Sequence, residues 1–265
     1  AKMQADLHVS QLDDELILDF EPGLLDAVTQ RLESHIIADQ VELIDASPHF
    51  GLLSLQGPKT ADALASLGLA LPGEPFAHAK SPLDGLGEVY VMNNGRYGTA
   101  GCDLYISTGH LGEAAARLAK AVEGQGGRLA GWQATEIARV EAGIPRFGID
   151  MDNKTLPPEA GLETRAISYT KGCYIGQEII ARIRTYGRVN RTLVGYRLEA
   201  DLASGTQLTD DSGKTVGTLT SVIESPRFGP IALGLAKRGS ETPGQVLTAR
   251  EPAQGQATVA EIPFR

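Results

Sequence analysis

The sequence is poor in cysteine and in aromatic residues. Its 265 residues include only Cys102 and Cys173, and Phe, Trp and Tyr together make up 5%. Two cysteines in a chain of this size exclude a disulfide framework and favour a reducing, cytoplasmic compartment. With so few aromatic rings, aliphatic side chains must form most of the core.

Long hydrophobic runs and an excess of basic residues are also absent. No stretch approaches the roughly 18 to 20 apolar residues of a membrane-spanning helix, and no export signal is visible, so we expect no membrane association. The net charge of −9 argues against non-specific nucleic-acid binding by the whole surface. There is no Walker loop or dinucleotide-binding glycine motif, and the histidines lack metal-ligand spacing, so we predict no metal site.

The hydrophobic pattern predicts an α+β fold, because helical and strand patterns do not alternate as in a doubly wound sheet. Period-two patterns predict early strands at residues 15–20, 41–46, 50–56, 87–92 and 102–107. From residue 191 onward, short runs of β-branched and aliphatic residues are separated by Gly, Pro, Ser and Asp, which predicts a small barrel or sandwich. We therefore expect two domains, at residues 1–190 and 191–265.

The segment Lys171-Gly172-Cys173-Tyr174 and the helix predicted after it, at residues 175–184, carry the most distinctive chemistry. We expect Cys173 at or just before the helix N-terminus, where free N–H groups and the helix dipole favour a thiolate. Lys171 adds positive charge, and both influences lower a thiol pKa. A buried, unreactive cysteine is the alternative interpretation. One cysteine cannot hold an iron–sulfur cluster alone, since four thiolate-type ligands are normally needed.

Basic residues gather in this part of an otherwise acidic chain. Residues 171–191 contain one acid, Glu178, and five bases: Lys171, Arg182, Arg184, Arg188 and Arg191. Guanidinium groups bind carboxylates and phosphates well, so a polyanionic ligand fits here, as does a local contact with tRNA. The alternative is a solvated face with surface ion pairs, and the acidity of the chain weighs against RNA.

Several motifs resemble one superfamily. Lys171-Gly172-Cys173-Tyr174-x-Gly176-Gln177-Glu178 resembles the signature of YgfZ-type folate-binding proteins, relatives of the aminomethyltransferase (T-protein) of the glycine cleavage system. The stretches 139–145 and 156–159 resemble the superfamily's helix and Pro-Glu loop, and 217–221 and 229–234 resemble its C-terminal barrel. Asp6 matches a position where T-proteins place a functional carboxylate, although the first of their two adjacent acids is Ala5 here.

This resemblance implies a folate-binding body with antiparallel sheets, followed by a small C-terminal β-barrel, with tetrahydrofolate or a derivative as cofactor. It also implies that the chain starts late, because family members carry a further N-terminal segment. We interpret Cys173 as the reactive group, with Lys171 as its electrostatic partner and Asp6 as a third catalytic candidate. The candidates for binding folate are Asp6, Glu159, Tyr174, Gln177, Glu178, Arg182 and Arg184.

One departure from the T-protein pattern bears on activity. T-proteins show a Tyr-Thr-Gly-Glu-like turn followed by an acidic strand residue, whereas the matching stretch here, residues 96–103, lacks the turn's Glu. Proton transfer needs a positioned acid or base, so this loss favours an accessory protein for iron–sulfur cluster assembly or repair, with client or assembly proteins as partners. The alternative is a tetrahydrofolate-dependent aminomethyltransferase, and a non-catalytic module that contacts tRNA is a third hypothesis.

Overall fold

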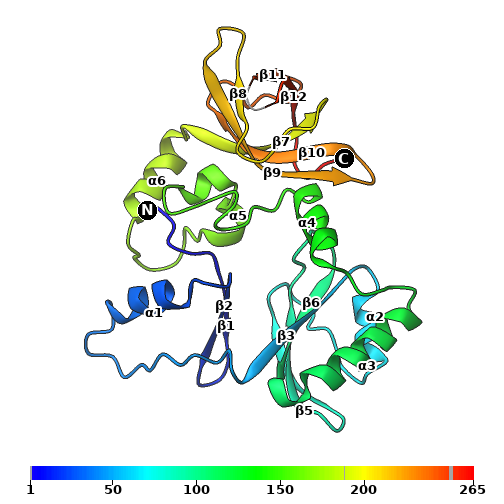
Figure 1. Ribbon diagram of the computed structural model, residues 1–265. Coiled ribbons are helices and arrows are strands. Elements are labelled where there is room, and N and C mark those ends of the chain that lie inside the picture. The colour runs from blue at the N-terminus through cyan, green and yellow to red at the C-terminus, as the bar shows by residue number, and fades with distance from the viewer. Residues whose placement is uncertain (1, 188, 251–252) are drawn as a thin grey trace. The chain divides into compact units, whose positions relative to one another are not determined.

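A computed structural model describes residues 2–187, 189–250 and 253–265 (Figure 1). The chain divides into two compact units, one of residues 7–132 and one of residues 1–6 with 133–265. The domain boundary expected at residue 190 falls inside the second unit, immediately before its barrel, and stays a prediction. No helix in the described part of the chain is long and apolar enough to cross a membrane.

The unit of residues 7–132 is built on a four-stranded antiparallel sheet in the order β3-β6-β5-β4. Its strands are β3 (Phe50–Gln56), β4 (His78–Leu83), β5 (Gly87–Asn93) and β6 (Gly101–Ser107). Helices α2 (Thr60–Ala65) and α3 (Leu111–Gly124) pack on it through aliphatic residues such as Leu64, Leu104 and Leu118. A separate antiparallel pair, β1 (Leu7–Gln11) and β2 (Leu16–Phe20), precedes α1 (Leu25–Glu33).

Four of the five early strands predicted from the sequence are confirmed by β2, β3, β5 and β6. The strand predicted at 41–46 is wrong, because residues 34–49 contain no strand. Val41 and Ile44 are exposed there. The segment that contains them has an alternating apolar pattern but no neighbouring strand to pair with. Cross-strand pairing, rather than the propensity of the residues, decides whether a strand forms.

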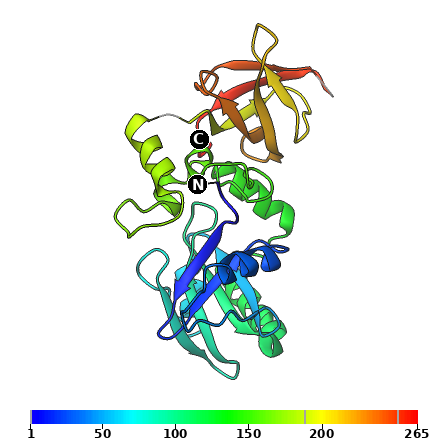
Figure 2. The same cartoon turned by 90° about the vertical axis from the view of Figure 1, so that its left-hand side faces the viewer.

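The second unit ends in a closed six-stranded barrel in the order β10-β7-β12-β11-β8-β9, drawn in yellow to red in Figures 1 and 2. Its strands are β7 (Arg191–Leu198), β8 (Gln207–Thr209), β9 (Thr215–Ser225), β10 (Gly229–Lys237), β11 (Val246–Ala249) and β12 (Gly255–Ala260). Before the barrel come α4 (Trp132–Glu141), the short helices η2 (Pro157–Ala160) and α5 (Glu163–Ala166), and α6 (Gln177–Tyr186). The antiparallel sheets, helices and barrel confirm the predicted fold class.

The interior of the barrel is organised around the ring of Tyr196 in β7, which is fully buried. Its hydroxyl has no hydrogen-bond partner in the part of the chain that the structure describes, and burial raises its pKa. Gly217 in β9 and Gly234 in β10 lie against this side chain: a Cβ at either position would come to 3.0 Å from its hydroxyl or Cε2 atom. The two glycines therefore leave the space that the ring fills.

A buried ionic network joins α4 to the barrel. The Arg139 guanidinium donates to Asp150 Oδ2 at 2.8 Å and to the Ser221 hydroxyl of β9 at 2.7 Å. The Ser221 hydroxyl in turn donates to Asp150 Oδ1 at 2.7 Å. Because Arg139 and Asp150 are both buried, each needs the other as a partner, and together they fix the segment after α4 against β9.

Candidate functional site

The candidate site begins with the segment that leads into α6. Predicted to start at residue 175, α6 starts at Gln177, because its N-cap Gly176 has φ 91°, a left-handed conformation that glycine adopts without strain. Cys173 lies three residues before this cap, outside the first turn over which the helix dipole acts strongly. Its thiol is free and exposed. The alternative of a buried Cys173 is therefore wrong.

Two cation–π contacts order the segment on either side of the thiol. The Lys171 ammonium lies 5.4 Å from the centroid of the Tyr174 ring, and the Arg184 guanidinium lies 4.0 Å from that of Tyr169. Gln177 Oε1 accepts a hydrogen bond of 3.1 Å from the backbone N–H of Tyr174. Both residues are predicted to bind a ligand. In the structure Gln177 holds the local backbone, and the Tyr174 ring contacts the Lys171 ammonium.

Several side chains of α6 face solvent. Ile180 is buried, whereas Ile179 and Tyr186 are exposed, as is Ile175 just before the helix. Glu178 and Arg182 are exposed, and neither forms an ion pair with any residue that the structure describes. This surface is therefore both apolar and cationic.

The basic cluster seen in the sequence is only partly free. Arg191 Nε is 3.1 Å from Glu159 Oε2, and Arg188 lies outside the described residues. The same Glu159 oxygen accepts a 3.1 Å hydrogen bond from the backbone N–H of Leu156, at the start of η2. Glu159 is buried. These two contacts account for its burial, and its predicted role in folate binding stays a prediction.

Asp6 lies at the end of the N-terminal segment. That segment is held by Met3, whose backbone N–H donates to the Thr155 carbonyl at 3.1 Å and whose side chain packs on Met151 and Leu162. Asp6 is half-buried, and its carboxylate has no hydrogen bond or ion pair among the residues the structure describes. Among the predicted site carboxylates, Asp6 and Glu178 thus keep their hydrogen-bonding capacity unused by the described residues, whereas Glu159 is engaged.

The unit of residues 7–132 contains a second polar cluster, centred on Asp103 of β6. Asp103 is buried and accepts hydrogen bonds from Ser54, Asn94 and Arg96. Arg96 Nη2 also reaches Asp19 Oδ2 at 2.6 Å. Burial alone would raise the pKa of Asp19, but the hydrogen bond from His8 and the charge of Arg96 outweigh it and lower the pKa.

Sequence reasoning noticed Asp103 only as part of the 96–103 stretch and missed Asp19 and Asn94 as its neighbours. The available signal was a charged residue inside an apolar strand pattern, because such a residue needs a buried partner. Cys102, next to Asp103, is fully buried, and this burial together with the Asp103 charge raises its pKa to about 12.

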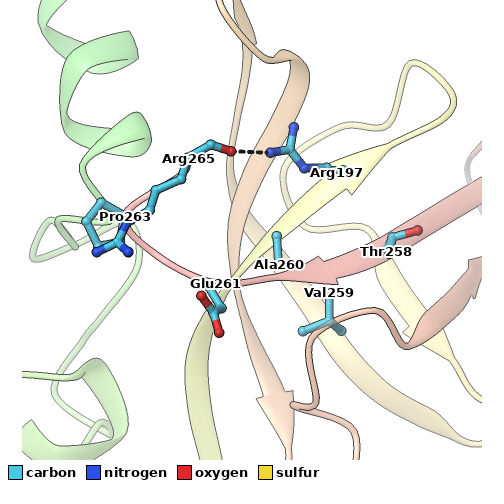
Figure 3. A pocket seen from close by; sticks show the side chains of 7 residues that line it. All are labelled: Arg197, Thr258, Val259, Ala260, Glu261, Pro263 and Arg265. Atoms are coloured by element: carbon cyan, nitrogen blue, oxygen red, sulfur yellow. Dashed lines mark hydrogen bonds between the residues drawn. The ribbon is translucent and has the colours of Figure 1, made fainter.

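No metal-binding group of three or more His, Cys, Asp or Glu side chains occurs among the described residues. A hollow of about 290 Å³ lies beside the barrel, between β12 and the C-terminal residues (Figure 3). Arg197 Nη2 donates there to the Arg265 carbonyl at 3.0 Å. None of the predicted site residues lines this hollow.

Comparison with known proteins gives consistent matches. Residues 1–171 match the GCVT N-terminal domain. The chain is 30% identical over 261 residues to the "putative transferase, chloroplastic" of Arabidopsis thaliana, covering 97% of this chain and 58% of that protein. It is 30% identical over 238 residues to the aminomethyltransferase of Nostoc sp., covering 87% of this chain and 61% of that protein. The chain thus spans about three fifths of these curated relatives.

A structural comparison agrees with these matches. The crystal structure of glycine cleavage system aminomethyltransferase T from Bartonella henselae matches with a TM-score of 0.84 at 23% identity, covering 100% of this chain and 73% of that one. At this identity the likeness shows the fold and carries no residue roles.

Proposed function

This chain belongs to the family of the GCVT N-terminal domain and has an aminomethyltransferase-like T-protein fold; from that premise we propose that it binds a reduced folate and serves iron–sulfur cluster assembly or repair through Cys173. The proposal places it in the YgfZ-type branch of the superfamily. Its support comes from the Lys171–Glu178 motif and from the turn carboxylate that the 96–103 stretch lacks.

The exposed thiol of Cys173 is the observation that carries the proposal. Of the two cysteines, Cys102 is buried with a raised pKa, so only Cys173 is available to an iron atom or another thiol. A cysteine ligates metals through its sulfur, and exposure gives a metal access to the sulfur of Cys173. The low cysteine count suits a reducing compartment such as the cytoplasm, which we include in the proposal.

The residues present fit a reduced folate in part. When bound, a reduced folate supplies a pterin ring with N–H donors, nitrogen atoms that carry one-carbon groups, and a carboxylate tail. The unpartnered Asp6 carboxylate suits the pterin donors, and the exposed Arg182 guanidinium suits the tail. Four other candidates already have contacts, which they would keep or exchange when folate binds: Glu159, Tyr174, Gln177 and Arg184. Glu178 is exposed and is a candidate for the same role.

The test separates folate binding from the role of the thiol. Saturating tetrahydrofolate, at about 100 times its Kd, adds about 2.7 kcal/mol to the free energy of unfolding, seen as a higher melting temperature. We expect Asp6→Asn to reduce this shift. Cys173→Ala is expected to keep the fold and to lower the activity of iron–sulfur enzymes in cells, with Cys102→Ala as the matched control. Wild-type enzyme activities in Cys173→Ala cells would refute the role of the thiol.

A second candidate is tetrahydrofolate-dependent aminomethyl transfer, with Asp6 as the group that holds or moves a proton at the folate amine. It is favoured by the names of relatives such as the aminomethyltransferase of Nostoc sp.. Turnover of an aminomethyl donor that Asp6→Asn abolishes would support it. Folate binding without turnover would leave the first proposal standing alone.

A further inference from the structure

Beyond the proposed function, and independently of it, we propose that the β1–β2 hairpin and the chain that follows it form a docking surface for a basic, extended segment of another protein. We call residues 13–45 the acidic region; it runs from the turn of the hairpin through α1 and the segment after it. Three observations support the proposal: the distribution of charge along the chain, apolar side chains left in solvent, and strands with free edges.

The acidic region carries the whole net charge of the chain. It contains ten acids and one base, Arg31, a net charge of −9, whereas the remaining residues hold 23 acids and 23 bases. Eight of the ten acids are exposed and form no ion pair with any residue that the structure describes: Asp13, Asp14, Glu15, Asp26, Glu33, Asp39, Glu42 and Asp45. This concentration of one sign attracts a cationic partner and repels an anionic one.

Large apolar side chains lie in solvent among these charges. Leu16 is 62% exposed, Ile37 92%, Val41 57% and Ile44 72%. Figures 1 and 2 both show α1 and the segment after it next to the hairpin, so the four side chains belong to one part of the unit. Exposed apolar side chains gathered in this way, with polar residues around them, mark an interaction site.

The two faces of the β1–β2 hairpin differ in what they contact. On one face, Asp19 Oδ2 lies 2.6 Å from Arg96 Nη2, and the ring of His8 stacks on that of Phe76. The opposite face is apolar except for Gln11, and its other members belong to no hydrophobic core cluster of the described residues: Leu7, Val9, Leu16, Leu18 and Phe20. The hairpin therefore has one face bound within its unit and one apolar face that is partly open.

The edges of the hairpin select the conformation of the partner. Among the described strands, β1 and β2 pair only with each other, so each keeps one edge of unpaired N–H and C=O groups. An extended segment can add to such an edge as a further strand, with alternate side chains on the apolar face of the hairpin. Its lysine or arginine side chains would then reach the surrounding acids.

The charge of the acidic region weighs against other occupants. It repels nucleic acid and anionic membranes, and a second copy of this chain would bring the same negative region. No group of three or more His, Cys, Asp or Glu side chains that could hold a metal ion occurs in the part of the chain that the structure describes. A basic segment of a different protein satisfies both the charge and the exposed apolar side chains.

A synthetic peptide of defined sequence tests the surface directly. The probe is a dye-labelled peptide of about ten residues in which lysine alternates with valine, long enough to form one strand. Its binding to the full chain is followed by fluorescence anisotropy. We expect binding that weakens as salt rises from about 50 to 500 mM, because ions screen the charges. Control peptides with glutamate for lysine, or serine for valine, should bind at least about tenfold more weakly. Equal binding of the three peptides would overturn the proposal.

Charge variants of the protein test the acidic region itself. Asp39→Lys with Glu42→Lys should weaken binding of the lysine–valine probe about threefold to tenfold, since each exposed ion pair contributes little. The matched control is Asp201→Lys with Asp211→Lys, which makes the same change of net charge at exposed acids of the other unit. An equal loss of affinity in both variants would mean that the probe responds to net charge alone, which contradicts a local docking surface.

Hydrogen exchange measured by mass spectrometry locates the bound probe. We expect slower exchange in residues 7–20, because an added strand protects a free edge of the hairpin, and no change in residues 191–265. Val9→Ser with Leu16→Ser should weaken binding at least about tenfold, whereas Leu129→Ser, a 78% exposed position of the same unit, should not.

Each outcome of these measurements decides the proposal. Protection outside residues 7–45, or wild-type affinity in a Val9→Ser, Leu16→Ser variant that melts at the wild-type temperature, would refute the docking surface. If that variant melts early, the exchange pattern of the wild-type protein decides. Sedimentation that shows a dimer of the free chain, with the same residues protected in it, would assign the surface to a second copy and also refute the proposal.

Discussion

The Asp103 cluster and the Cys173 segment use the same kinds of side chain in opposite ways. Around Asp103, a buried carboxylate receives donors from Ser54, Asn94 and Arg96, and Arg96 continues to Asp19. Around Cys173, the thiol, Arg182 and Glu178 are exposed, and the remaining cations rest on tyrosine rings. In the first region the charged groups find their partners within their own unit. In the second region the exposed groups are left to interact with another molecule.

This difference separates stability from function in the molecule. Removing a group from the complete cluster leaves a buried partner unsatisfied, which is costly. Removing a group from the exposed segment lets water replace it, which costs little. Mutations in the Asp103 cluster should therefore change the free energy of unfolding, whereas mutations in the Cys173 segment should change the affinity for another molecule.

The largest effect is expected from Asp103→Ala. It removes the acceptor of the buried Asn94 amide and one of the two carboxylates that pair with the half-buried Arg96, and should lower the free energy of unfolding by about 3 kcal/mol. Urea denaturation measures this loss. Asp13→Ala, an exposed carboxylate of the same unit, is the control and should change the free energy by less than about 0.5 kcal/mol. Equal effects would mean that the cluster is not complete as described.

The two cysteines give the next largest contrast. Cys102→Ser buries a hydroxyl in an apolar site and should cost about 1–3 kcal/mol, whereas Cys173→Ser should cost less than about 0.5 kcal/mol. Iodoacetamide at pH 8 should modify only Cys173 in the folded protein, because the Cys102 thiol is buried and its pKa is raised to about 12. Rapid modification of Cys102 without urea would break the comparison.

Low pH should destabilise the Asp103 cluster through the protonation of Asp19. The folded-state pKa of Asp19 is lowered, so its ionised form stabilises the protein above the unfolded-state pKa of about 4, and this contribution is lost as pH falls towards the folded-state value. Urea denaturation at pH 5 and pH 3 should show a smaller fall in stability for Asp19→Asn than for the wild type. Asp13→Asn should keep the wild-type fall, and an identical slope in Asp19→Asn would contradict the assignment.

The smallest effect is expected for the pair of Arg184 and Tyr169. A partly exposed cation–π contact is worth about 0.5 kcal/mol, which a double-mutant cycle of Arg184→Met and Tyr169→Leu measures as their coupling. Arg182→Met with Tyr169→Leu is the control cycle and should show no coupling. A coupling above about 2 kcal/mol would show that this segment is as tightly built as the Asp103 cluster.

The sequence predicted the elements whose patterns are long and self-contained. Strands β3, β5 and β6 follow from period-two patterns, and the barrel follows from the short apolar runs after residue 191. Strand β4 escaped detection because Lys80 and Pro82 interrupt its pattern. The structure places β4 at the edge of the sheet, where a proline without an N–H is tolerated. Strand β8 is three residues long, too short to show a period.

For the site, the sequence identified an unusual segment but not the state of its side chains. Exposure of Cys173 depends on which face of α6 packs against the protein. The buried side chain of Ile180 marks that face in the structure, and the sequence does not distinguish it. The engagement of Glu159 by Arg191, 32 residues away, and of Asp103 by Asn94 and Ser54 depends on tertiary contacts. Pairing over such separations has no local pattern in one sequence.

The glycines that flank Tyr196 have a consequence for redesign of the barrel. Because Gly217 and Gly234 each lie against the tyrosine side chain, the three positions form a single volume shared among three strands. At Gly217 the tyrosine hydroxyl is the nearest atom to an added Cβ, so a larger residue there needs a shorter side chain at position 196. At Gly234 an added Cβ would also clash with the backbone oxygen of Thr218, which no change of the ring relieves. A library for this module should therefore vary codons 196 and 217 together and keep Gly234.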